Sequence, residues 1–102
     1  MAILHKSLPR YRARHILVED MDDAEYVLEK IEAGEDFSEL AREISECNSA
    51  SKGGDLGLVV SGQVVPEVER ALYHLEMNEV SRPIESEYGF HIIQRLPLSK
   101  VK

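Results

Sequence analysis

Two short segments near opposite ends of the chain each place a histidine directly before an apolar run. The segments cover residues 14–18 and 90–94, and their histidines are His15 and His91. A single histidine at such a position is often only a polar residue at the start of a strand. If the two segments are antiparallel neighbours, however, the imidazoles can share one N–H···N hydrogen bond that satisfies both rings without charge. We therefore expect a buried, neutral histidine pair.

The single cysteine, Cys47, has two interpretations. A free cysteine is commonly buried as a small apolar residue, whereas a nucleophilic cysteine needs positive surroundings that favour the thiolate. Cys47 is predicted near the C-terminal end of a helix, in a chain of net charge −7, so its surroundings are negative. This argues against covalent catalysis. A single cysteine also excludes an internal disulfide, and no cluster of His and Cys offers four zinc ligands, so we expect no metal site.

Other patterns that suggest chemistry are weaker. The glycine-rich run at 53–57 has neither the G-x-G-x-x-G pattern of dinucleotide sites nor the G-x-x-x-x-G-K pattern of phosphate loops. The carboxylates at 19–23 are almost contiguous, which is typical of a solvated face. The histidines and the cysteine therefore remain the candidates for a site.

Apolar periodicity predicts the elements that position these residues. We expect a strand from Arg12 to Val18, a helix over 22–33 that Asp22 caps and Gly34 ends, and a second helix from Asp36 to about Cys47. An irregular loop follows at 48–57. The rest is predicted as a short strand at 58–60, a helix at 66–75, a strand at 79–85 interrupted by Pro83, and a final strand at 90–96. This order predicts an α+β fold with a small, mostly antiparallel sheet and helices packed on it.

Length and composition narrow the functional classes. The chain has 102 residues, 43% hydrophobic and 30% charged, which fits one globular domain. We expect a loosely held lead-in at 1–11, the domain at 12–97 and a tail at 98–102. The negative charge opposes binding to nucleic acid and to anionic membranes. No membrane span or secretory signal is evident, so we expect a cytoplasmic chain, or a periplasmic or extracellular one if it is a module of a longer exported protein.

Six segments in order resemble the parvulin-type peptidyl-prolyl cis/trans isomerases. They are residues 13–18, 34–41, 45–49, 53–57, 62–67 and 88–93, and the resemblance runs from about Arg12 to Leu96. It implies a four-stranded antiparallel sheet wrapped by helices, with the first and last strands central and adjacent. It also implies a monomeric enzyme that isomerises X-Pro bonds of unfolded or exposed polypeptide, non-covalently and without a cofactor.

The resemblance also implies roles for individual residues. His15, Cys47 and His91 match a buried polar cluster that Ser86 joins. The residues matching the substrate-binding set are Leu56, Gln63, Val64, Val68 and Phe90. Two positions depart from the family pattern, because Val64 stands where Met is frequent and Val68 where Phe is common, which widens the prolyl pocket. The short acidic stretch at 19–23 replaces the long basic loop of the phosphate-specific branch, so phosphorylated substrates are not expected. The alternatives are a non-catalytic parvulin-like module that holds extended polypeptide, and a plain acidic interaction domain.

Overall fold

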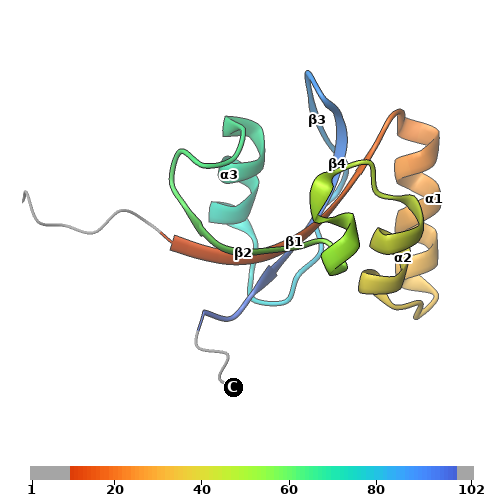
Figure 1. Ribbon diagram of the computed structural model, residues 1–102, viewed down its shortest axis with the longest axis horizontal. Helices are drawn as coiled ribbons and strands as arrows, with labels where there is room; N and C mark the ends of the chain where they lie inside the picture. The colour runs from red at the N-terminus through yellow and green to blue at the C-terminus, as the bar shows by residue number, and fades with distance from the viewer. Residues whose placement is uncertain (1–9, 99–102) are drawn as a thin grey trace, which may run out of the picture.

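The first and last strands form the centre of a four-stranded antiparallel sheet (Figure 1). The computed structural model describes residues 10–98. The strands are β1 (Arg10–Val18), β2 (Asp55–Val60), β3 (Ile84–Ser86) and β4 (Gly89–Leu96), and their order in the sheet is β2-β1-β4-β3. This arrangement confirms the predicted α+β fold and the predicted pairing of the first strand with the last.

Helices cover both faces of this sheet. They are α1 (Met21–Glu32), α2 (Phe37–Ile44) and α3 (Pro66–His74), with a short 3₁₀ helix, η2 (Asn48–Lys52), between α2 and β2. Figure 1 shows α1 and α2 on one side of the β1–β4 pair and α3 on the other. None of the helices in residues 10–98 is long and apolar enough to span a membrane.

The sheet separates two apolar cores because successive strand residues point to opposite faces. On one face, Ile16, Val18 and Ile92 pack against α1 and α2. On the other face, a second core packs around α3 and consists of Tyr11, Ala13, Val59, Val68, Leu72 and Ile93. His15 and His91 follow the same alternation and therefore lie on the α3 face, beside the second core.

Aspartate side chains start the first two helices. Asp36 accepts a hydrogen bond from the Glu39 backbone N–H at 3.1 Å, as predicted. The prediction for α1 was wrong by two residues, because Asp20 and not Asp22 caps it, accepting from the Asp23 N–H at 3.0 Å. Gly34 ends α1 as predicted, with a φ of 97° that suits glycine.

Several element boundaries differ from the prediction. Strand β1 begins at Arg10, and Tyr11 is only 6% exposed, so both belong to the sheet and not to a lead-in. Residues 1–9 and 99–102 lie outside the described part, so the remainder of the predicted lead-in and tail stays a prediction. The predicted loop at 48–57 contains η2 and the start of β2.

The predicted strand at 79–85 is also shorter than expected. Within this part of the chain, the pairing with β4 is limited to β3 and to an isolated bridge between Val80 and Gln94. Pro83 lies between them and has no N–H to donate, and the Ser81 hydroxyl accepts the Ile93 N–H at 3.1 Å in place of a regular ladder bond.

The edge strand β2 has part of its backbone covered by side chains of its own and of the following loop. The Gly57 N–H donates to the Asp55 carboxylate at 2.8 Å, and the Val60 N–H donates to the Gln63 side-chain oxygen at 2.8 Å. The turn after β2 is further closed by the Gln63 N–H, which donates to the Val60 carbonyl at 3.0 Å.

A glycine holds β1 close to the segment that precedes β2. The His15 N–H donates to the Gly54 carbonyl at 2.9 Å, and a Cβ at Gly54 would lie 2.5 Å from the His15 carbonyl oxygen. Gly57 has a similar positive φ, but a Cβ there would meet nothing within 4 Å. Both glycines therefore have a positive φ, but only Gly54 lacks space for a side chain.

We predict that Gly54→Ala destabilises the domain more than Gly57→Ala does. Gly57→Ala should cost roughly 1–2 kcal/mol through backbone strain alone. Gly54→Ala should cost about 1–3 kcal/mol more, because its methyl group collides with the backbone of His15. Urea unfolding of the three proteins measures the difference. Equal stabilities of the two variants would contradict the predicted collision.

Candidate active site

The antiparallel pairing of β1 and β4 brings the two histidines together. His15 is opposite Ile93 and His91 is opposite Leu17, so the two histidines are diagonal neighbours on the same face of the sheet. His15 Nε2 lies 2.8 Å from His91 Nδ1, and the rings are stacked at 5.0 Å between centroids. His15 is 6% exposed and His91 is 4% exposed. The hydrogen bond predicted from the sequence is therefore confirmed.

Ser86 extends this pair into a chain of hydrogen bonds. Its hydroxyl lies 2.6 Å from His91 Nε2 and accepts the Tyr88 N–H at 3.1 Å. The tight turn from β3 to β4, in which Ser86 pairs with Gly89, holds the hydroxyl in this place. The hydrogen bonds can be donated in either direction along this chain. Either Ser86 donates to His91 and His91 donates to His15, or His15 donates to His91 and His91 donates to Ser86. Each arrangement keeps both rings neutral.

Burial is the main cause that keeps the pair neutral. It lowers the pKa of His15 from 6.5 to about 4, with a smaller contribution from the neighbouring His91. Burial also lowers the pKa of His91, and the carboxylate of Glu67 in the first turn of α3 partly opposes this shift. A proton on either ring is disfavoured at neutral pH, in agreement with the neutral pair expected from the sequence.

Cys47 lies in the same site but outside the hydrogen-bonded chain. It directly precedes η2 and is three residues beyond the end of α2, so it lies near a helix end as predicted, although α2 stops at Ile44 and not at about Cys47. Its side chain lines the cavity beside the histidines. His15 Nδ1 is buried and has no hydrogen-bond partner among residues 10–98, so the thiol does not bond to it. The structure thus brings Cys47 to the cavity wall as a neighbour of the pair.

A mostly apolar cavity of about 360 Å³ opens in front of the histidines. It is lined by His15, Leu17, Cys47, Leu56, Gln63, Val64, Val65, Val68, Tyr88 and His91. Four of the residues predicted to bind substrate are therefore in its wall: Leu56, Gln63, Val64 and Val68. Val68 is only 2% exposed and also belongs to the core with Leu72 and Ile93, so it contributes both to the cavity wall and to the core.

The structure does not bring Phe90, which the sequence predicted to bind substrate, to the cavity wall. Phe90 packs against the core of α1 and α2, on the face of the sheet opposite the cavity. The physical reason is strand alternation, because Phe90 immediately precedes His91 in β4 and so points the other way. Tyr88, two residues earlier in the turn, lines the cavity in its place.

Sequence reasoning also missed three cavity residues: Leu17, Val65 and Tyr88. Alternation could have found Leu17, because it follows His15 by two positions on the same strand face. No comparable signal marked Tyr88, which is 62% exposed and lies in a turn. Ser86 was predicted to join the histidine cluster, and its hydroxyl does contact His91. Ser86 itself is not part of the cavity wall.

Comparison with known proteins identifies the class of this fold and site. The family model of the rotamases, described as a PPIC-type PPIase domain, matches residues 15–96, and the chain belongs to this family. Among curated relatives it is similar to the foldase protein PrsA of Halalkalibacterium halodurans, 53% identical over 88 residues, which cover 85% of this chain and 26% of that protein.

Solved structures agree with this assignment. The peptidylprolyl isomerase PrsA from Bacillus anthracis has a TM-score of 0.87 and 38% identity, over 97% of this chain and 46% of that one. NmPin, the parvulin of Nitrosopumilus maritimus, has a TM-score of 0.79 and 41% identity, over 90% of this chain and 99% of that one. The chain thus spans about a quarter of its Halalkalibacterium relative and nearly all of the Nitrosopumilus parvulin.

We predict that the buried histidine makes stability depend on pH. The unfolded chain takes up a proton at the ordinary histidine pKa of 6.5, whereas folded His15 does so only at about 4. The stabilisation is therefore complete above pH 6.5 and is lost as the pH falls toward 4. Between pH 7 and 4, the wild type should lose about 3 kcal/mol more unfolding free energy than His15→Gln.

Two measurements check this prediction. Urea unfolding of the wild type and of His15→Gln across this pH range gives the difference, and NMR titration of the imidazole C–H signals gives the pKa of His15 directly. An imidazole that titrates near 6.5, together with parallel pH profiles of the two proteins, would contradict the assignment.

Proposed function

We propose that this domain catalyses cis/trans isomerisation of X-Pro bonds in unfolded or exposed polypeptide segments. The observation that carries the proposal is the apolar cavity that faces a buried neutral histidine pair, in a member of the PPIC-type PPIase family. The relatives named foldase and peptidylprolyl isomerase support it. The chain spans about a quarter to a third of the length of these curated relatives. The proposal therefore concerns the activity of this domain.

The reaction sets the energetic task of the site. Rotation about the peptide bond crosses a barrier of about 18–20 kcal/mol, and an uncatalysed X-Pro bond takes tens of seconds to isomerise. A turnover on the order of 10²–10³ per second needs roughly 5–7 kcal/mol of extra transition-state stabilisation. No covalent bond forms or breaks, so the site must bind the twisted amide more tightly than the planar one.

The cavity has an apolar wall and a wall formed by the histidines, and both suit the binding of a twisted amide. Leu56, Val64 and Val68 provide an apolar surface for the prolyl ring, and enclosure removes water from the amide. The planar amide is the more polar form, so removing water favours the twisted state. The twisted nitrogen is pyramidal, and its lone pair can accept a hydrogen bond. The site needs a donor near that nitrogen to use this change.

We infer that this donor lies near the histidine chain. When Ser86 donates to His91 and His91 donates to His15, the remaining N–H of His15 is at Nδ1, which is buried and has no partner in the described residues. This N–H does not face the cavity, so the chain acts by keeping two neutral rings fixed in the cavity wall. Cys47 contributes a polarizable wall beside the pair and no covalent step.

The charges around the site favour substrates without phosphate. The connection between β1 and α1 consists of Glu19 and Asp20 alone, both exposed, and Glu67 lies close enough to influence His91. These carboxylates would repel a phosphate group on the residue before proline and would attract a cationic residue there. We infer a preference for neutral or basic residues before proline. The monomeric state, the cytoplasmic location and the absence of nucleic-acid or membrane binding stay predictions from the sequence.

We predict that the domain accelerates isomerisation of X-Pro tetrapeptides in a protease-coupled assay. Peptides with Arg or Leu before proline should have a kcat/KM at least tenfold higher than a phosphoserine-proline peptide. The advantage of the Arg peptide over the phosphoserine peptide should fall with added salt because charges are screened. A folded sample that leaves all spontaneous rates unchanged would contradict the proposal. NMR exchange between cis and trans signals separates catalysis from simple holding of the peptide, the alternative function, which shifts the signals without exchange.

We also predict that Cys47→Ser keeps kcat/KM within about tenfold of the wild type. The thiol lies outside the hydrogen-bonded chain, so a hydroxyl of similar size preserves the wall. A nucleophile replaced by serine would instead lose most activity. The same assay measures this, with a thermal melt of the variant as control. A loss of more than a hundredfold in a folded variant, or a covalent adduct of substrate with the thiol, would overturn the non-covalent role.

A further inference from the structure

One loop forms a whole side of the cavity. Residues 61–65 connect β2 to α3 and are called the 61–65 loop from here on. Gln63, Val64 and Val65 of this loop all line the cavity. The loop has no regular secondary structure of its own, so the shape of this wall depends on what fixes the loop.

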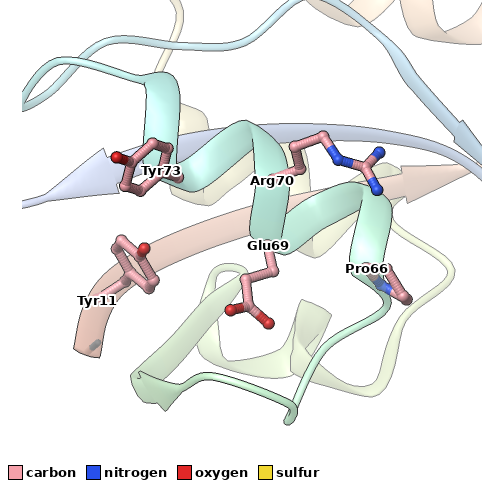
Figure 2. A pocket seen from close by; sticks show the side chains of 5 residues that line it. All are labelled: Tyr11, Pro66, Glu69, Arg70 and Tyr73. Atoms are coloured by element: carbon pink, nitrogen blue, oxygen red, sulfur yellow. The ribbon is translucent and has the colours of Figure 1, made fainter. Parts of the chain in front are cut away.

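The Glu69 carboxylate fixes the start of this loop from α3. Its Oε2 accepts a hydrogen bond from the Ser61 hydroxyl at 2.5 Å, and its Oε1 accepts the Gly62 N–H at 3.0 Å. Figure 2 shows the Glu69 side chain extending from α3 toward the loop, on the side of the helix that also carries a surface pocket. Both carboxylate oxygens are therefore used by the two residues that precede the cavity wall.

The two bonds favour the charged carboxylate. The Ser61 hydrogen bond lowers the pKa of Glu69, and the Gly62 backbone bond adds to this shift. Hydrogen bonds to an ionised acceptor are shorter and stronger than neutral ones. The far end of the loop continues directly into α3 at Pro66, the first residue of that helix. The loop is therefore attached to α3 covalently at one end and through Glu69 at the other.

We propose that Glu69 is a positioning residue of the isomerase site, which holds the 61–65 loop so that Gln63 and Val64 form the cavity wall. This inference rests on the proposed function. Glu69 lies in a different surface pocket, lined by Tyr11, Pro66, Glu69, Arg70 and Tyr73, and acts on substrate only through the loop. Its loss should weaken contacts that are made with substrate and transition state alike, so it should raise KM and leave kcat nearly unchanged.

The test compares Glu69→Ala and Glu69→Gln with the wild type. Glu69→Ala should raise KM about tenfold with kcat within twofold, measured at a temperature where circular dichroism shows each protein folded. Glu69→Gln keeps one oxygen acceptor for the loop and should recover most of the loss. Glu43→Ala is the matched control, because Glu43 is an exposed helical glutamate of α2, and its KM should stay unchanged.

A binding measurement makes the inference independent of turnover. Titration of an Ala-Leu-Pro-Phe peptide, followed by NMR, should show a Kd about tenfold higher for Glu69→Ala than for the wild type. Wild-type protein without isomerase activity would overturn the proposed function, and the Kd comparison would still decide the role of Glu69. An unchanged KM and Kd in folded Glu69→Ala would overturn this inference alone.

A milder variant covers the case in which Glu69→Ala does not fold. Ser61→Ala removes only the hydroxyl that donates to Glu69, and it should raise KM and Kd about threefold. A purely structural role of the contact would lower the melting temperature and leave both values unchanged, and this outcome would overturn the positioning role.

Discussion

The hydrogen bond between His15 and His91 depends on the pairing of the first strand with the last. The two residues are 76 positions apart in sequence, and only the β1–β4 ladder brings their rings to 2.8 Å. Every other element lies between these two strands in the chain. The candidate site is therefore a property of the whole domain, and a contact of such high sequence separation is typical of slowly closing topologies.

The two faces of the sheet carry different tasks. The face covered by α1 and α2 is a closed apolar core around Ile16 and Ile92. The α3 face has a similar core, but this core ends at the cavity, where Val68 serves both. The first core contributes no residue to the cavity wall, whereas the second core contributes Val68. The histidine pair remains neutral because it lies next to this second core and away from water.

The sequence was sufficient to predict elements with a strong period and contacts that follow from alternation. The helices, the central strands and the facing histidines belong to this group. Phe90 lies away from the cavity because it directly precedes His91 in β4 and therefore takes the other face of the sheet. A matched motif does not state which face a residue takes, but this adjacency does. Tyr88, η2 and the short β3 depend on turn geometry and on tertiary hydrogen bonds such as the one from Ile93 to Ser81, which leave no periodic signal in the chain.

The covered backbone of β2 has a consequence for strand addition at this edge of the sheet. An open sheet edge invites extended chains to add themselves as a further strand, and such association can grow into aggregates. On β2, the N–H groups of Gly57 and Val60 are already bonded to Asp55 and Gln63. These two N–H groups are therefore not available to an extended chain that approaches the β2 edge of the sheet.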